Sequence, residues 1–238
     1  MKNKTVYFTT AICTLAIAII SLSCTNKAVS SSTPAGQTLD NFKNISVGGC
    51  WDVFVTNAAT SEIRMEGDQA EIDKIDATVK NGTLYISMKK NDMDCKGSVK
   101  IYISTSELHR VDLGGSGNIK LESKFTNSES MDFSVAGSGS IEGEISSPDV
   151  DAEIAGSGNI KLTGDTKSLD IDIAGSGNFN GDGLACNNSD IDISGSGEAH
   201  VKVDTKLDVE IAGSGDVYYS GEPTITKSIA GSGKVRKN

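Results

Sequence analysis

The sequence predicts an all-β fold, a parallel β-helix (β-solenoid) of about seven Gly-Ser-Gly rungs with a β-rich N-terminal capping segment. The tripeptide Gly-Ser-Gly recurs at intervals of 18 to 22 residues, beginning at Gly115, Gly137, Gly156, Gly175, Gly195, Gly213 and Gly231. Periods near 20 residues are typical of solenoids, in which stacked short units supply the core that no single unit can form. Apolar and polar residues alternate around each motif, which is the pattern of a strand with one buried face.

Apolar columns on both sides of the motif define the expected strands. The column two residues before the first glycine contains Leu113, Val135, Ile154, Ile173, Ile193, Ile211 and Ile229. The column four residues after that glycine contains Ile119, Ile141, Ile160, Phe179, Ala199, Val217 and Val235. Each rung should therefore contain two short strands joined by a Gly-Ser-Gly corner, where glycine permits positive φ and close approach of stacked backbones. Successive rungs should pair in parallel, about 4.8 Å apart.

The segment from 39 to 110 precedes the repeats and has more varied β patterns. Alternation predicts strands over 45–47, 51–56, 63–66 and 99–103, and a short helix is expected around 69–75. Asn81-Gly82 lies between two alternating runs, which is a strong hairpin signal. At the other end, Lys227 stands at an inward position and residues 234–238 are basic, so the seventh rung is expected to be a polar cap.

The first 23 residues have the layout of a secretory signal, with Lys2 and Lys4 before an apolar run and small residues before Cys24. Ser21-Leu22-Ser23-Cys24 resembles a lipobox with its leucine displaced by one position, so we expect cleavage before Cys24 and lipidation of its thiol. An uncleaved anchor is the alternative, although the run is short for a bilayer span of roughly 20 residues. The expected organisation is signal peptide 1–23, lipid-anchored flexible tether 24–38, β-rich segment 39–110 and repeat solenoid 111–238.

The charge balance argues against nucleic acid as a partner. The chain has a net charge of −10, and removal of Lys2 and Lys4 with the signal makes it −12. Apart from the basic residues at 234–238, no cluster of Lys and Arg appears in the sequence. Contacts to phosphates need such basic side chains.

Three cysteines besides Cys24 belong to the expected mature chain, namely Cys50, Cys95 and Cys186. An exported protein lies where disulfides persist. Because Cys50 and Cys95 share the N-terminal segment, we expect them to pair and Cys186 to remain as the odd thiol. Zinc binding is a weaker alternative, since no Cys-x-x-Cys motif or nearby His accompanies them.

Acidic residues form two columns beside the inward positions. One column contains Asp132, Asp151, Asp170, Asp190 and Asp208, and the other contains Asp112, Glu153, Asp172, Asp192 and Glu210. Like charges about 5 Å apart repel at a cost of order 1 kcal/mol per pair in water. One hypothesis is a row of weak Ca²⁺ sites, above all at Asp132, Asp151, Asp170, Asp190, Asp208, Asp172 and Asp192, because hard cations take carboxylate oxygens. The alternative is a solvated face whose charge is balanced by protons, sodium ions and lysines.

We expect no catalytic residues. The seven motif serines and a partial column of Asn118, Asn159 and Asn178 are interpreted as structural ladders. A nucleophilic serine needs a neighbouring base, and neither His109 nor His200 lies in a recognisable constellation. Parallel β-helices also include polysaccharide lyases and hydrolases, but that analogy is of fold alone. The short, uniform rungs lack insertions that could form the walls of a cleft.

Three features together resemble a known family. They are Ile45-Ser46-Val47 with Trp51-Asp52-Val53-Phe54-Val55, the hairpin Asn81-Gly82-Thr83-Leu84-Tyr85-Ile86, and the repeated Ala-Gly-Ser-Gly. The combination is similar to the auto-transporter adhesin head (GIN) domain, which is common in lipoproteins of Bacteroidetes, over roughly residues 39 to 235. The resemblance implies a β-helical fold and an adhesin role, and it supplies no catalytic residues.

These observations favour a non-catalytic interaction module of the cell envelope, adhesin-like or glycan-binding. The alternatives are a periplasmic structural or signalling-associated protein and, less favoured, a polysaccharide-active enzyme. We expect the membrane as a partner through the lipid anchor, a glycan or protein as ligand, and no cofactor except Ca²⁺ in the acidic columns. The outer membrane is the expected location. Residues 25–30 lack an acidic export run, which favours its periplasmic face over the surface. The oligomeric state stays open.

Overall fold

The computed structural model describes residues 36–89, 95 and 97–238. The predicted signal peptide, Cys24 and the tether up to residue 35 lie outside the described residues. No helix within the described ranges is both long and apolar enough to cross a membrane.

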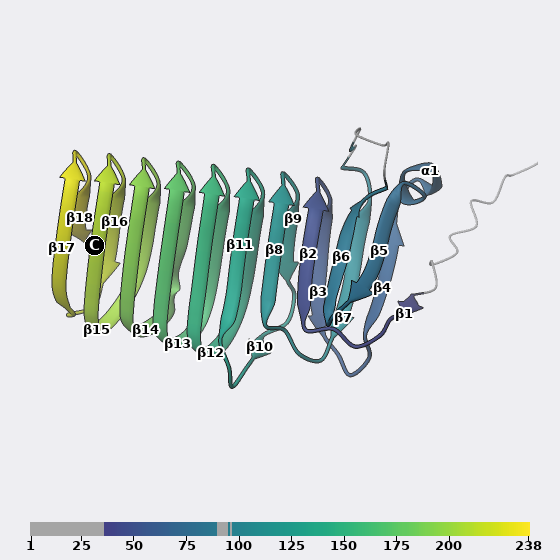
Figure 1. Cartoon of the computed structure of the whole chain (residues 1–238). Helices are drawn as coiled ribbons and strands as arrows, with labels where there is room; N and C mark the ends of the chain where they lie inside the picture. The colour runs from purple at the N-terminus through teal and green to yellow at the C-terminus, as the bar shows by residue number, and fades with distance from the viewer. Residues whose placement is uncertain (1–35, 90–94, 96) are drawn as a thin grey trace, which may run out of the picture. The chain divides into compact units, whose positions relative to one another are not determined.

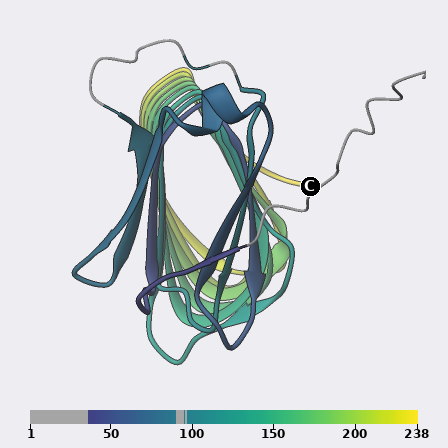
Figure 2. The same cartoon turned by 90° about the vertical axis from the view of Figure 1, so that its right-hand side faces the viewer.

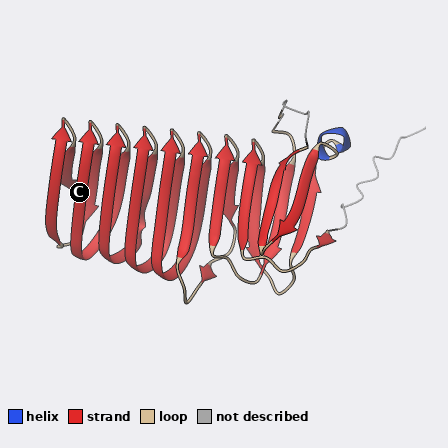
Figure 3. Ribbon diagram, viewed as in Figure 1, coloured by secondary structure: helices blue, strands red, loops and turns tan. Residues whose placement is uncertain are grey.

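The described residues form a solenoid made almost wholly of strands (Figures 1 and 3). Its N-terminal elements are β1 (Gln37–Thr38), β2 (Asn44–Gly49), β3 (Asp52–Asn57), β4 (Glu62–Glu66), α1 (Gln69–Ile72), β5 (Ile75–Lys80), β6 (Thr83–Met88) and β7 (Lys100–Thr105). The repeat elements are β8 (Arg110–Gly115), β9 (Asn118–Leu121), β10 (Phe125–Thr126), β11 (Met131–Gly137), β12 (Ser140–Gly156), β13 (Asn159–Gly175), β14 (Asn178–Gly195), β15 (Glu198–Gly213), β16 (Asp216–Ser220), β17 (Thr224–Gly231) and β18 (Lys234–Lys237). The predicted β-solenoid is confirmed.

Strands before and after each corner form two opposed layers, seen end-on in Figure 2. We call the layer of strands that lead into the corners the front sheet; it runs β5–β6–β2–β8–β11, through the second halves of β12 to β15, to β17. The layer of strands that leave the corners is the rear sheet; it runs β1–β4–β7–β3–β9, through the first halves of β12 to β15, to β16 and β18. Pairing is parallel throughout the repeats.

The Gly-Ser-Gly corners stack directly on one another. The first glycine of every motif has φ between +122° and +143°, which side chains other than hydrogen rarely allow. The serine N–H then donates to a glycine carbonyl of the preceding rung at 2.7 to 3.1 Å. A Cβ on any of these glycines would overlap that carbonyl oxygen, so the motif recurs because the stacking of corners requires it.

Two rungs without Gly-Ser-Gly precede the seven with it. Strands β2 and β3 form one of them, in which Gly49 is in register with Gly115 and Asp52 with Asn118. Cys50 and Trp51 therefore occupy the corner positions that Ser and Gly take in the repeats. Strands β6 and β7 form the other, stacked on the outer side of β2 and β3. Chain order and spatial order thus differ at this end.

The interior is a column of aliphatic side chains. Ile154, Ile173 and Ile193 are each no more than 2% exposed, as are most inward residues of β8 to β15. In the final rung Ile225 and Ile229 are 36% and 37% exposed, because no further rung of this chain covers β17. Lys227 is exposed there, in register with the inward Val209.

Local signals predicted most of the N-terminal elements, with differences in their bounds. Strand β1 was not predicted: it lies within the segment expected to be a tether and pairs with β4. Asn81 and Gly82 have φ of 51° and 74°, and they join β5 to β6 as the predicted hairpin. The helix expected around 69–75 ends at Ile72, after Asp68 caps its N-terminus. The buried Ile75 instead begins β5, because its side chain contributes to the core cluster.

Candidate functional site

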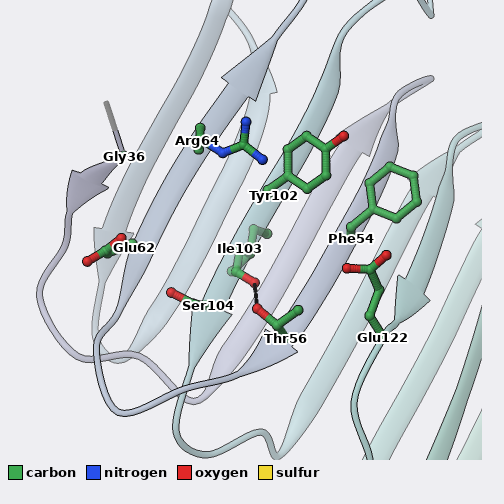
Figure 4. A pocket seen from close by; sticks show the side chains of 9 residues that line it. All are labelled: Gly36, Phe54, Thr56, Glu62, Arg64, Tyr102, Ile103, Ser104 and Glu122. Atoms are coloured by element: carbon green, nitrogen blue, oxygen red, sulfur yellow. Dashed lines mark hydrogen bonds between the residues drawn. The ribbon is translucent and has the colours of Figure 1, made fainter. Parts of the chain in front are cut away.

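A hollow of about 410 Å³ lies on the outer surface of the rear sheet, near its N-terminal end (Figure 4). Strands β3, β4 and β7 supply most of its lining, and Glu122 follows β9. Its lining residues are Gly36, Phe54, Thr56, Glu62, Arg64, Tyr102, Ile103, Ser104 and Glu122. Alternation along β3, β4 and β7 places Phe54, Tyr102 and Arg64 outward, whereas Ile103 is 1% exposed and belongs to the core.

An aromatic stack stands in this hollow. Phe54 and Tyr102 are in register on adjacent strands, with ring centroids 5.2 Å apart and planes inclined by 21°. The Arg64 guanidinium lies 4.1 Å from the Tyr102 ring centroid, a cation–π contact, and also pairs with Glu66. The stack therefore combines a rigid apolar surface with a fixed positive charge.

The hollow also contains hydrogen-bonding groups of both kinds. Burial, then the neighbouring Glu66 carboxylate, raises the pKa of Tyr102 above its ordinary 10.0, so its hydroxyl remains protonated at neutral pH. Glu62 and Glu122 carry carboxylates as acceptors, and Ser104 carries a hydroxyl that donates to the Thr60 carbonyl at 2.9 Å. Such an arrangement can bind a ligand that presents both hydroxyls and apolar C–H faces.

A second stack occupies the C-terminal end of the same sheet. His200 and Tyr218 lie with ring centroids 4.7 Å apart, and the Arg236 guanidinium is 5.8 Å from the Tyr218 ring. The other histidine, His109, contacts Glu107 at 2.7 Å and Glu129 at 3.4 Å. Neither histidine lines the hollow of Figure 4.

The predicted acidic columns lie on the front sheet. Asp132, Asp151, Asp170, Asp190 and Asp208 are in register on successive strands. In the second column Glu153, Asp172, Asp192 and Glu210 are in register, but Ser134 separates Asp112 from them. A shallow hollow of about 240 Å³ overlies part of both columns.

Basic side chains close the first column at both ends. Arg110 contacts Asp132 at 3.1 Å, and Lys206 pairs with Asp208 and lowers the pKa of that carboxyl. Between these ends, burial and then the charges of Asp132 and Asp170 raise the pKa of Asp151. Burial, then neighbouring carboxylates, likewise raises the pKa of Asp170 and of Asp192.

No group of three or more His, Cys, Asp or Glu suited to a metal ion occurs in the described part of the chain. Ca²⁺ binding along the acidic columns therefore rests on their charge alone and stays a prediction.

The cysteines are divided between a disulfide and a buried thiol. Cys50 and Cys95 are bonded, with Cα atoms 6.0 Å apart. The bond joins the corner of the β2–β3 rung to the segment that leads into β7, so it holds two neighbouring rungs together. Cys186 is a free thiol, 1% exposed, and burial raises its pKa to about 12.

Sequence reasoning did not single out Tyr102 and Arg64. Tyr102 stands at an outward position between the buried Ile101 and Ile103, and Arg64 follows the buried Ile63. An outward aromatic residue between buried neighbours is a signal that the alternation contains. The contact between Tyr102 and Phe54 could not be predicted in the same way, because their strands β7 and β3 are separated in the chain by β4 to β6.

Comparison with protein-family models identifies a family for most of the chain. Residues 41–223 match the model described as "Putative auto-transporter adhesin, head GIN domain". No curated protein matches the chain.

Comparison with solved structures gives the same fold. A "putative adhesin" from Bacteroides fragilis NCTC 9343 has a TM-score of 0.81 at 22% identity, over 86% of this chain and 96% of that one. A "putative lipid binding protein" from Parabacteroides distasonis ATCC 8503 has a TM-score of 0.70 at 24% identity, over 87% and 98%. A "putative adhesin" from Parabacteroides merdae ATCC 43184 has a TM-score of 0.70 at 21% identity, over 86% and 95%. At these identities the likeness concerns the fold.

Proposed function

The chain belongs to the head GIN domain family, and from this premise we propose that it is a non-catalytic interaction module of the cell envelope that binds glycans in an adhesin-like role. The observation that carries the proposal is the aromatic stack in the hollow of Figure 4. Half-buried aromatic rings beside a few fixed polar groups are typical of ligand sites.

The lining of the hollow fits a sugar better than a purely apolar ligand. Arg64 and Phe54 cover the two faces of the Tyr102 ring, so the apolar surface left for the C–H groups of a pyranose is the outer face of Phe54 and the edges of both rings. Glu62 and Glu122 can accept hydrogen bonds from its hydroxyls, while Arg64 can donate to its oxygens. A lipid chain would leave these charged groups desolvated without partners, which costs free energy.

The comparisons support a role without catalysis. The matching family model and two of the similar solved structures are described as adhesins, not as enzymes.

A glycan array tests the binding proposal. The purified full chain is applied to immobilised neutral linear, branched and anionic glycans, beside Tyr102→Ala and the control Tyr85→Ala. Tyr85 is 45% exposed on the front sheet, so its removal changes an aromatic outside the hollow. We expect wild type and Tyr85→Ala to bind the same glycans and Tyr102→Ala to bind about tenfold more weakly. Absence of binding by wild type, or equal binding by Tyr102→Ala, would contradict the proposal.

The envelope location has its own test. Cys24, with its lipobox-like sequence, is the proposed site of a lipid anchor in the outer membrane. Intact cells are treated with a protease that cannot cross that membrane, and the chain is followed by immunoblot beside a periplasmic control. Loss of the chain with the control intact supports an adhesin that faces outward. Digestion only after lysis favours the periplasmic alternative, provided that the purified chain is itself cleaved.

A further inference from the structure

The hollow of Figure 4 is the first of three that adjoin along the rear sheet. A second, of about 330 Å³, shares Phe54 with the first and extends to Lys120 and Glu142. A third, of about 180 Å³, shares Lys120 and Glu142 with the second and extends to Lys161. The three therefore meet at common side chains and cross β4, β7, β3, β9, β12 and β13 in that order.

One column of outward side chains links the three hollows. The second hollow lies on the side of the column nearer the corners, with Asn118 and Ser140, and the first and third lie on its other side, with Ser104 and Thr163. Strand register places Arg64, Tyr102, Phe54, Lys120, Glu142 and Lys161 side by side on the six strands. At about 4.8 Å between strands, the column is roughly 24 Å long. A single sugar contacts only a small part of that length, whereas a linear chain can lie over all of it.

The column and its borders carry charges of both signs. Lys120 pairs with Glu142 at 3.0 Å, and Arg64 pairs with Glu66, which lies outside the column. Lys161 adds a third cation to the column, and the bordering Glu62, Glu122 and Glu144 add carboxylates. An anionic polymer would meet these carboxylates, and a cationic polymer would meet the lysines. The mixture of charges fits an uncharged chain that exchanges hydrogen bonds with both kinds of side chain.

An extended peptide fits this surface less well than a glycan. Peptides that add to a sheet hydrogen-bond to an open strand edge. Here β7 lies between β4 and β3, and β9 lies between β3 and β12, so the backbone groups are already paired. The surface offers side chains instead. Asn118 donates to Asp52 at 2.8 Å and accepts from Ser140 at 2.7 Å, which fixes the polar side of the second hollow.

We propose that the three hollows form one track that holds a neutral, linear glycan parallel to the solenoid axis. This inference rests on the glycan-binding function proposed above and adds the shape and charge of the ligand. Successive sugars lie over successive strands, with the aromatic stack at one end of the track and Lys161 at the other.

Chain-length dependence tests the track. Binding of neutral linear β-glucan, β-mannan and N-acetylglucosamine oligomers, two to six sugars long, is measured by calorimetry with the purified full chain. We expect affinity in at least one series to rise about tenfold from two sugars to six. Lys161→Ala should remove most of that gain. Lys167→Ala should preserve it, because Lys167 is an exposed lysine beside a different hollow.

Each contrary result has a separate meaning. Equal affinity for two and six sugars would overturn the track while leaving the single glycan-binding hollow in place. Binding confined to anionic glycans or to peptides would overturn the neutral glycan. Binding of no oligomer in any series would overturn both the track and the glycan-binding function.

Discussion

Single side chains on the front sheet determine how the acidic columns affect stability. Asp151 and Asp170 lie in register with like charges on both sides, and both have a raised pKa. Asp208 has a cationic partner in Lys206, and its pKa is lowered. An aspartate at the same repeat position therefore favours folding in its charged form when a basic side chain is near, and opposes folding in that form when only other carboxylates are near.

Asp170→Asn should stabilise the protein at pH 7. Burial, then Asp190 and Asp172, raises the pKa of Asp170, so its charged form is unfavourable in the folded state. Because the folded chain binds this proton more tightly than the unfolded chain does, the contribution of Asp170 to wild-type stability becomes more favourable as pH falls through the folded pKa. We expect a gain of about 0.5 kcal/mol at pH 7, small because solvent screens the site. The gain should vanish below the unfolded pKa, near 3.8. Urea unfolding at several pH values measures it.

Asp165→Asn is the matched control for that experiment. The Ser146 hydroxyl, and then Lys124, lowers the pKa of Asp165, so its charged form favours folding. The substitution should destabilise the protein at pH 7, and its effect should fade as pH drops through the lowered folded pKa. Effects of equal sign for the two variants would refute this electrostatic account.

Gly175→Ala should be strongly destabilising. Gly175 has φ of +130°, and an added Cβ would overlap the carbonyl oxygen of Gly156. We expect a loss of about 2 to 4 kcal/mol in the free energy of unfolding, since strain and overlap act together. Ser176→Ala at the same corner removes only an exposed hydroxyl and should cost under about 0.5 kcal/mol. Thermal and urea unfolding compare the pair, and similar losses would argue against corner stacking as the cause.

At the scale of elements, a disulfide holds the two N-terminal rungs together, whereas stacked Gly-Ser-Gly corners hold the repeats together. The β2–β3 rung has Gly49-Cys50-Trp51 at its corner, and Cys50 is bonded to Cys95 ahead of β7. Trp51 is 2% exposed and occupies the place of the second motif glycine. A bulky residue fits there because no Gly-Ser-Gly corner stacks on its outer side.

Reduction of the Cys50–Cys95 bond should lower stability by about 2 to 4 kcal/mol, because the bond closes a long loop in the unfolded chain. Melting temperature with and without a reductant measures the loss. A Cys50→Ala/Cys95→Ala variant should melt at the temperature of the reduced protein and respond no further. Cys186 should stay unalkylated in the folded state, since it is buried and its pKa is raised to about 12. A melting temperature that reductant leaves unchanged would contradict the prediction.

For the whole molecule, the solenoid separates two outer surfaces of different character. The front sheet carries the acidic columns, and the rear sheet carries both aromatic stacks. Strands that alternate inward and outward residues allow each face to vary without changing the core. The rear face can therefore carry the proposed glycan site while the acidic columns of the front face are unaffected by it.

Attachment to the membrane is the remaining prediction at this scale. Cys24→Ala should abolish acylation of the exported chain, so the protein should leave the membrane fraction for the soluble one. Cys13→Ala changes a cysteine within the predicted signal peptide and should leave attachment intact. Mass spectrometry of the N-terminal peptide, together with fractionation, measures both. Membrane association that persists in Cys24→Ala would show that another segment anchors the chain.

The sequence by itself determined the repeat, its period and the inward columns, because each depends on local spacing and alternation. It also indicated the hairpin at Asn81-Gly82 and the registered aspartates, since parallel stacking of equal repeats aligns equal positions. The sequence predicts which residues form a column wherever successive rungs in the chain are also neighbours in space.

Where the spatial order of the rungs differs from their order in the chain, only the tertiary structure showed which residues meet. The β6–β7 rung stacks outside β2–β3 although it comes later in the chain, and this reversal brings Tyr102 beside Phe54. The antiparallel pairing of β4 with β7 then places Arg64 over the Tyr102 ring. No local pattern contains such pairings, because they depend on which free sheet edge the returning chain meets, and the candidate site is built from them.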